Sequence, residues 1–320
     1  MGAVSVLLIA IVLDLIFGDP SPNSPWKSTY KLHPTVWMGK LTKALEPHFK
    51  SANSKVEKLY GIILALTVIL GFALPVYFAL SFIASLGILF YVIIAAIVLK
   101  LTVCIKLESD WAKAATKAIE SDNLIEAKKY SHFSRRESKD LNGEQISSSV
   151  IESMAENLID FKLSPIFSFA FLGVSGAIAF RAINTLDGTV GFRDPEHINI
   201  GWFSANLDTI VNYIPARVTA FFIIIASALI GEDYRNAWAI ARRDNAKTPS
   251  RNHGWPMAAM AGALRVQLEK PGQYILGEKI DPLLPNKIMQ ALRIRNMVII
   301  LCILFSLPII LLTRLYFFPF

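Results

Sequence analysis

The stretch EQISSSVIESMAENLID, residues 144–160, places three acids four residues apart, directly before the apolar run FKLSPIFSFAFLGVSGAIAF, residues 161–180. At 100° per residue, one half of a helical wheel is apolar. The other half carries Ser148, Glu152, Gln145, Glu156, Ser149, Asp160, Ser153 and Asn157. The stretch therefore predicts an amphipathic helix with a carboxylate stripe at the start of a membrane segment.

Acids at this spacing repel one another by a few tenths of a kcal/mol even when hydrated, and by more where a membrane lowers the dielectric constant. A cation should therefore lie against them. The candidates are a hard divalent metal ion, an amine substrate, or an arginine from elsewhere in the chain. The alternative is a solvated helix face at the bilayer surface, which is a common use of amphipathic helices.

Composition indicates an integral membrane protein. The 320 residues are 53% hydrophobic and 18% charged, with a mean hydropathy of +0.46. A soluble domain is normally less apolar and more charged. The apolar runs are Ala3–Phe17, Gly61–Leu80, Ala84–Cys104, Leu163–Phe180, Arg217–Ile230 and Met297–Phe318. The runs near 61 and 84, and the last run, are long enough to cross a bilayer.

The first apolar run resembles a signal peptide in position only. It lacks a basic n-region and a small-residue cleavage site, and Asp14 lies inside it. We therefore expect a retained membrane helix.

Lysine and arginine are concentrated in three polar stretches, 18–59, 105–162 and 232–295. The positive-inside rule places these stretches in the cytoplasm, which puts the N-terminus outside and makes 61–104 a hairpin. Topology and anionic lipid account for the net charge of +7, and no basic patch is interleaved with aromatics, so nucleic acid is not an expected partner. Cys104 and Cys302 lie at or inside apolar runs and are expected to be reduced packing residues.

The polar stretches differ in pattern. Residues 107–133 have apolar positions at helical spacing with a break at Asp122 and Asn123, which predicts a solvated helical pair. Residues 232–295 carry repeated proline and glycine, which predicts loops around short helices. No sustained alternation predicts a sheet, so the expected fold class is all-α, a polytopic helical membrane protein with cytoplasmic helical and loop insertions.

A second group of polar residues lies at 179–218, between two short apolar runs of about 15 and 13 residues. Ionisable groups beside apolar segments are costly and usually pair or mark a site. Short runs bounded by proline or glycine are often discontinuous helices whose ends point into a binding site. If 163–231 is re-entrant, the 181–216 link returns to the side of the carboxylate helix.

Several blocks along nearly the whole chain resemble the CbiB/CobD-type adenosylcobinamide-phosphate synthases, integral membrane proteins of cobalamin (vitamin B12) biosynthesis. The blocks are DLIFGDP with HPTVWMGKL (14–41), EQISSSVIESMAENLID with SPIF (144–167), RAINTLDGTVGFRD (181–194), GWFSANLDTIVNYIPARVTA (201–220) and RRDNAKTPSRNHGWPMAAMAGALRVQL (242–268). Two motifs depart from the family pattern. Arg136, Glu137 and Ser138 stand where RDT is usual, and Arg251 and Met257 replace a proline and an acid.

The resemblance implies a ligase reaction that forms an amide between the free propionate of adenosylcobyric acid and the amine of aminopropanol or its O-phosphate. It also implies ATP and Mg²⁺, a multi-pass protein of the cytoplasmic membrane, and other membrane enzymes of cobalamin assembly as candidate partners. An acyl phosphate made from ATP is the ordinary route to such an amide, with a base to free the amine. No GxxxxGK[ST] loop or glycine-rich dinucleotide fingerprint marks a nucleotide site, and HExxH, CxxC and GxSxG are absent.

Carboxylates can bind Mg²⁺ or take the ammonium proton, and arginines can hold phosphate or propionate through two hydrogen bonds. Together with the resemblance, this predicts a catalytic set of Glu152, Glu156, Asn157, Asp160, Arg181, Asn184 and Asp187. The predicted metal ligands are Glu152, Glu156 and Asp187. The predicted substrate-binding set is Asp14, Asp19, His33, Arg136, Arg193, Asp194, Asp208, Asn212, Arg217, Arg243, Asp244, Asn252 and Trp255, of which Asn252 and Trp255 enter through the resemblance alone. For Asp14 the alternatives are an ion pair with an arginine or snorkelling to the interface.

We expect a single membrane-embedded domain over 1–320 with its active site on the cytoplasmic face. An arginine among Arg181, Arg193 and Arg217 should then lie within salt-bridge reach of Glu152, Glu156 or Asp160. The alternative functions are an ion-coupled transporter and a non-enzymatic signalling protein related to the membrane protein of β-lactamase induction. An inverted-repeat transporter should show matching hydropathy in its two halves, but 61–104 has no counterpart in the second half.

Overall fold

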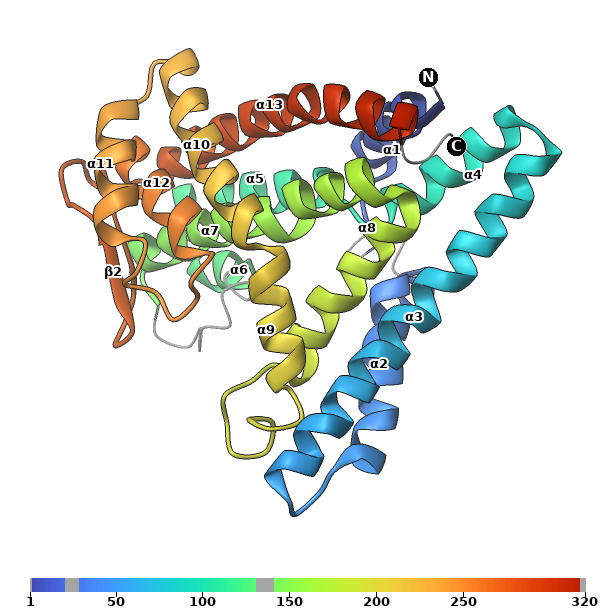
Figure 1. The fold of residues 1–320 in the computed structure, drawn as a ribbon. Coiled ribbons are helices and arrows are strands. Elements are labelled where there is room, and N and C mark those ends of the chain that lie inside the picture. Colours follow the sequence, from blue (N-terminus) through green and yellow to red (C-terminus); the bar gives the residue numbers. More distant parts are fainter. Residues whose placement is uncertain (1, 21–28, 131–140, 317–320) are drawn as a thin grey trace. The chain divides into compact units, whose positions relative to one another are not determined.

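The chain folds into two compact units in the computed structural model, which describes residues 2–20, 29–130 and 141–316. Unit 1 takes its described residues from Met1–Cys104, Ser164–Val211 and Ser306–Phe320, and unit 2 takes its own from Ile105–Leu163 and Asn212–Phe305. Helices dominate both units (Figure 1), so the predicted all-α class is confirmed. Each unit is assembled from segments that are far apart in the sequence.

Four helices are long and apolar enough to cross a membrane, within the part of the chain that the structure describes. They are Ser54–Leu86, Gly143–Val190, Tyr213–Ile230 and Asn286–Thr313. These helices confirm the polytopic character, while the topology and the single-domain organisation stay predictions.

Unit 1 contains helices from both halves of the chain. They are α1 (Gly2–Phe17), η1 (Tyr30–Leu32), α2 (Pro34–Leu45), η2 (Glu46–Phe49), α3 (Ser54–Leu86), α4 (Ile88–Lys100), α8 (Ser164–Val190), α9 (Trp202–Val211) and the end of α13 (Asn286–Tyr316). The predicted hairpin is formed by α3 and α4, which meet at Gly87 (Figure 1).

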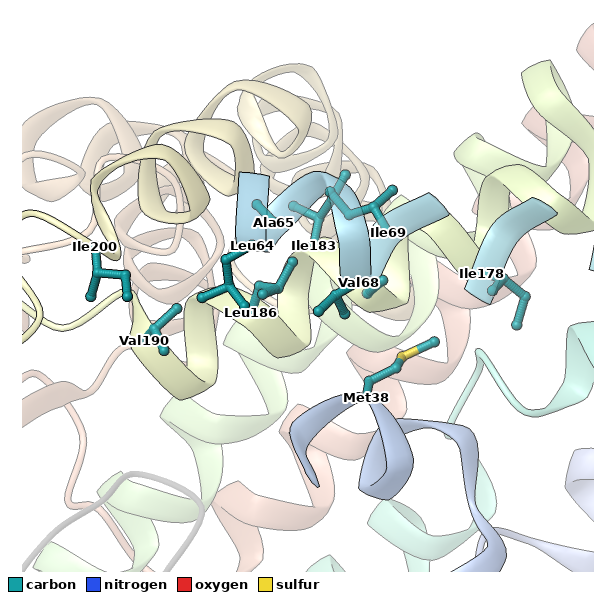
Figure 2. Packing of buried hydrophobic residues seen from close by; sticks show 11 residues of the cluster. Met38, Leu64, Ala65, Val68, Ile69, Ile178, Ile183, Leu186, Val190 and Ile200 are labelled. Carbon is teal, nitrogen blue, oxygen red and sulfur yellow. The ribbon is translucent and has the colours of Figure 1, made fainter. Parts of the chain in front are cut away.

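An apolar core joins α2, α3 and α8 in unit 1. Figure 2 shows Met38 of α2 pointing toward the apolar side chains of α3 and α8, including Val68 and Leu186. Gly61 allows α3 to approach the loop before α9, because a Cβ there would lie 2.1 Å from the carbonyl oxygen of Ile200. The core forms because burying apolar side chains is favourable.

Three helix lengths differ from those expected from the apolar runs. The run 84–104 does not form one crossing helix, because Gly87 (φ 140°) ends α3 and leaves α4 with 13 residues. Conversely, α10 (Tyr213–Ile230) has 18 residues and α8 has 27, with a non-helical Gly173 inside α8. Both helices extend beyond the apolar runs, α8 through the polar segment after Phe180 and α10 through Tyr213–Ala216, so the runs are shorter than the helices. Whether 163–231 is re-entrant stays a prediction.

Unit 2 is a smaller set of helices with one β-hairpin. Its elements are α5 (Lys106–Glu120), α6 (Leu124–Lys128), α7 (Gly143–Leu158), η4 (Ile159–Leu163), α10, α11 (Tyr234–Asp244), α12 (Gly254–Leu264), β1 (Gln267–Lys270), β2 (Tyr274–Gly277) and the start of α13. The pair α5 and α6, separated at Asp122 (φ 55°), confirms the predicted helical pair. The antiparallel hairpin was missed because strands of four residues are too short to show alternation.

The predicted carboxylate helix is α7, and it begins with a capping box. The Asn142 side chain accepts a hydrogen bond from the Gln145 backbone N–H, and the Gln145 side chain accepts one from the Asn142 N–H. After Leu158 the chain continues as a single π-helical turn, η4. Asp160 therefore does not follow the 100° spacing of the preceding acids.

Candidate functional site

The polar face of α7 is enclosed by protein in unit 2. Glu152 is 1% exposed, and its carboxylate accepts hydrogen bonds from the hydroxyls of Ser148 (2.6 Å) and Tyr274 (2.8 Å). The backbone N–H of Glu269 in β1 donates to the Ser148 hydroxyl at 2.9 Å. The solvated-face alternative is therefore wrong for Glu152, because the β-hairpin covers this part of the helix.

Asp160 pairs with a histidine that the sequence prediction did not include. His253, directly before α12, places its Nε2 3.1 Å from Asp160 Oδ1. Gly254 allows α12 to start close to the end of α11, because a Cβ there would lie 2.0 Å from the carbonyl oxygen of Asn245. Asp160 therefore pairs with an imidazole.

Glu156 lies between the other two acids of the stripe and is half-buried. Its electrostatic neighbours are His253, Asp160, Glu152 and Lys270. Among the residues that the structure describes, its carboxylate makes no hydrogen bond or ion pair. This carboxylate is available to a cation.

Asn157 belongs to a different network. Its amide donates to Glu108 Oε1 at 2.9 Å, while Glu108 Oε2 lies 2.6 Å from Lys162 Nζ and 3.4 Å from Arg295 Nε. These three charged side chains are buried. Buried ions need full compensation, so Glu108 serves as a structural anion and Asn157 connects α7 to it.

The predicted residues Arg217, Asn252 and Trp255 come together in unit 2. The Arg217 guanidinium donates to Asn252 Oδ1 at 2.8 Å and to the Tyr213 carbonyl at 2.9 Å. Its Cζ lies 3.6 Å from the Tyr213 ring centroid and 5.4 Å from that of Trp255, which are cation–π distances. Arg217 therefore does not meet the prediction of a salt bridge to the carboxylate stripe, since its partners are an amide, a carbonyl and aromatic rings.

Asn252 is adjacent in sequence to His253, so the Arg217 cluster and the Asp160 pair share one loop. Asn212, also predicted, is buried at the N-cap of α10. The loop before α12 therefore connects the two groups of predicted residues in unit 2.

Arg243 and Asp244 also lie in unit 2, at the end of α11. The Asp244 carboxylate accepts from Arg243 Nε (2.7 Å) and Nη2 (2.9 Å), from Lys247 Nζ (2.6 Å) and from the Gly277 N–H (2.8 Å). Burial by itself would raise the pKa of Asp244, but these hydrogen bonds outweigh it and hold the pKa at about 2. Asp244 therefore ties α11 to the β-hairpin.

The other predicted residues lie in unit 1. Lys100 lies 3.5 Å from the buried Asp14 and pairs also with Asp19, so the ion-pair alternative for Asp14 is the one observed, with lysine as the cation. His33 caps α2, and its Nδ1 lies 2.7 Å from the Thr35 hydroxyl. Burial, and then the charges of Arg181 and Lys100, lower the pKa of His33 to about 4, so the ring is neutral at pH 7.

Arg181 lies in unit 1 together with Asn184, to whose Oδ1 it donates at 3.2 Å. Asp187 follows one turn later on α8, half-buried. Asp208 is buried in α9. Because these residues and the α7 carboxylates belong to different units, a shared catalytic set and a metal site that includes Asp187 stay predictions.

The loop before α9 holds Asp194, whose carboxylate lies 2.8 Å from His197 Nδ1. His197 Nε2 lies 3.3 Å from Glu46, and the Glu46 carboxylate also meets Lys50 Nζ at 3.2 Å. His197 thus fastens this loop to η2, and Asp194 holds the imidazole from within the loop. Arg193 beside it is exposed, and Arg136 lies outside the described residues.

Sequence reasoning missed His253, Tyr274 and Ser148 as members of the site. His253 lies between the predicted Asn252 and Trp255, so its place in that block was the available signal. Tyr274 is 122 residues from Glu152 along the chain, and no local pattern connects them.

Comparison with known proteins gives one consistent family. The model of the CobD/Cbib protein family matches residues 7–300. The chain is 38% identical over 301 residues to "Probable cobalamin biosynthesis protein CobD" of Methanothermobacter thermautotrophicus, covering 94% of this chain and 96% of the relative. It is 34% identical over 315 residues to "Cobalamin biosynthesis protein CobD" of Dehalococcoides mccartyi, covering 98% of this chain and 99% of the relative.

No solved structure matches the chain significantly. The family match covers most of the chain, including the carboxylate helix and the loop that holds Asn252, His253 and Trp255. The chain belongs to the CobD/Cbib protein family.

Proposed function

We propose that this protein acts in cobalamin biosynthesis as an adenosylcobinamide-phosphate synthase, joining aminopropanol or its O-phosphate to the free propionate of adenosylcobyric acid. The observation that carries the proposal is Glu156, a half-buried carboxylate between two other acids, without a hydrogen bond or ion pair among the described residues. Family membership and the relatives named as cobalamin biosynthesis proteins support the pathway.

The amine substrate is an ammonium ion in solution, and three acids with one imidazole favour binding of such a cation. Glu152 is held in place by Ser148 and Tyr274, so its carboxylate has a fixed position beside the amine. Glu156 is the acid available to take the ammonium proton, which frees the amine for attack on the activated carbonyl. The Asp160–His253 pair can then hold that proton beside the site.

The propionate needs a cationic group that binds planar anions. Arg217 offers such a guanidinium, oriented by Asn252 and by stacking on Tyr213. Trp255 adds an aromatic face of the kind that can lie against a corrin ring. We propose that these residues hold the propionate end of the corrinoid.

As an alternative to the ammonium ion, the donor set fits Mg²⁺, because hard cations prefer carboxylate oxygens and the Glu156 carboxylate has no competing partner among the described residues. Glu152 and Glu156 would hold the ion, which when bound neutralises phosphate charge on ATP during activation of the propionate. We propose ATP as the co-substrate, the cytoplasmic face of the cell membrane as the location, and other membrane enzymes of cobalamin assembly as partners.

A direct assay tests the function. Purified protein in lipid nanodiscs is mixed with adenosylcobyric acid, Mg·ATP and either aminopropanol or its O-phosphate, and the corrinoid products are read by mass spectrometry. We expect a condensed product with one of the two amines and none without ATP. Absence of product with both amines, from protein that unfolds cooperatively, would refute the synthase.

A further inference from the structure

A cavity of about 600 Å³ lies between the β-hairpin and the end of α11 in unit 2. Its lining includes Lys247, Lys270, the turn at Gly272 and Tyr274. An open cavity of this volume suits a small molecule or one group of a larger molecule. The role of this cavity is not explained by the carboxylate site described above.

Lys270 gives the cavity an available positive charge. Lys270 is half-buried, and within the described ranges its side-chain ammonium group makes no hydrogen bond or ion pair. Glu269 also lines the cavity, and its carboxylate accepts from Gln267 Nε2 at 3.2 Å. A half-buried ammonium without a partner favours an anionic ligand.

Lys247 adds a second cation at the edge of the cavity. Its Nζ lies 2.6 Å from Asp244, but that carboxylate also accepts two hydrogen bonds from Arg243 and one from the Gly277 N–H. Asp244 therefore stays compensated if Lys247 turns toward a ligand. The turn at Gly272 (φ +73°) also leaves space for a ligand, because a Cβ on this residue would meet no atom within 4 Å.

The cavity shares a wall with the carboxylate site. Tyr274 lines the cavity and donates its hydroxyl hydrogen bond to Glu152 at 2.8 Å. Lys270 is an electrostatic neighbour of Glu156. An anion held by Lys270 would therefore lie beside the acids that we propose to act on the amine.

We propose that this cavity is a phosphate subsite, in which Lys270 and Lys247 bind the phosphate group of a small molecule. Naming its ligand rests on the proposed function, since both ATP and the O-phosphate of the amine substrate carry this chemistry. The phosphate preference itself rests on the two lysines and the open turn.

Binding measurements on the full chain in nanodiscs test the subsite without turnover. Isothermal titration is performed with Mg·AMP-PNP, with aminopropanol O-phosphate and with aminopropanol as the phosphate-free control. For at least one phosphate compound, Lys270→Gln should weaken binding by about 10-fold or more, and Lys270→Arg should weaken it less. Lys279→Gln is the matched control, because Lys279 is 69% exposed and outside this cavity, so binding should be unchanged.

The wild-type protein supplies a second measurement that no folding defect can affect. Lys270 should be protected from an amine-reactive reagent by the phosphate compound, as read by peptide mass spectrometry, whereas Lys279 should not. If just one of the two phosphate compounds protects Lys270, that compound is the source of the phosphate. Equal affinities in Lys270→Gln and wild type, or equal labelling of Lys270 with and without both phosphate compounds, would overturn the subsite. Lys270-dependent binding without any condensed product would preserve the subsite and refute the proposed synthase.

Discussion

The acid Glu108 and the stripe of acids on α7, both in unit 2, have different partners around their carboxylates. Glu108 is surrounded by Lys162, Arg295 and the Asn157 amide, so its charge is compensated by more than one cation. In the stripe, Glu152 accepts hydrogen bonds from two hydroxyls and Asp160 pairs with His253, while the Glu156 carboxylate makes no hydrogen bond or ion pair in the described parts of the chain. The difference indicates that Glu108 stabilises the fold, whereas Glu156 is the acid of the stripe that can accept a ligand.

The largest expected effect follows from removing the compensated acid. Glu108→Gln leaves Lys162 and Arg295 buried without their anion, which should lower the free energy of unfolding by about 3–5 kcal/mol. The measurement is thermal unfolding in detergent. Glu126→Gln, which removes an exposed acid paired with Lys129, is the control and should change little.

A triple replacement distinguishes a missing charge partner from a packing defect. Glu108→Leu with Lys162→Met and Arg295→Met removes all three charges, so it should recover most of the lost stability. Wild-type stability of Glu108→Gln would show that the network is not a structural ion cluster.

Replacing an acid of the stripe should reduce turnover without reducing stability. Glu156→Gln keeps size and removes a charge that adjacent acids repel, so stability should stay the same or rise. Turnover should fall by about 100-fold or more, if Glu156 acts as the base or as a metal ligand. Glu144→Gln is the control on the same helix, because Glu144 is 54% exposed. A change of less than a few-fold in turnover would remove Glu156 from the site.

A smaller effect is expected at the hydroxyl that holds Glu152. Tyr274→Phe removes a hydrogen bond to a buried carboxylate and should lower the free energy of unfolding by about 2 kcal/mol. Tyr130→Phe is the matched control, because its hydroxyl contacts a more exposed acid, Glu126, at 3.3 Å. The free energy of unfolding of both variants is measured with a denaturant. Equal decreases for Tyr274→Phe and Tyr130→Phe would contradict a stabilising role for the Tyr274 hydrogen bond.

A pH-dependent effect is expected at Asp244, an acid with a full set of donors. Its pKa is lowered from 3.8 to about 2, so its stabilising contribution is complete above pH 3.8 and is lost as the pH falls through 2. The stability difference between wild type and Asp244→Asn should be constant from pH 7 to 5 and should shrink toward pH 2. Thermal unfolding at each pH measures this difference, and a difference that widens on acidification contradicts the assignment.

The sequence predicted the membrane class and the carboxylate helix. Local rules sufficed here, because helical periodicity and the Asn142 cap are properties of neighbouring residues. Periodicity failed at Asp160, where the π-turn shifts the spacing. Family resemblance, and not local chemistry, supplied Asn252 and Trp255, which proved to lie beside Arg217.

Local patterns determined which residues would be helical, polar or apolar, because those preferences act over one or two turns. Only the tertiary structure decided which acids are compensated. Glu108 meets Lys162 from 54 positions away and Arg295 from further still, while Glu152 meets Tyr274 across 122. Contacts of that kind depend on how helices pack, and a charge is stabilised by the groups that packing brings near it rather than by its neighbours in the chain.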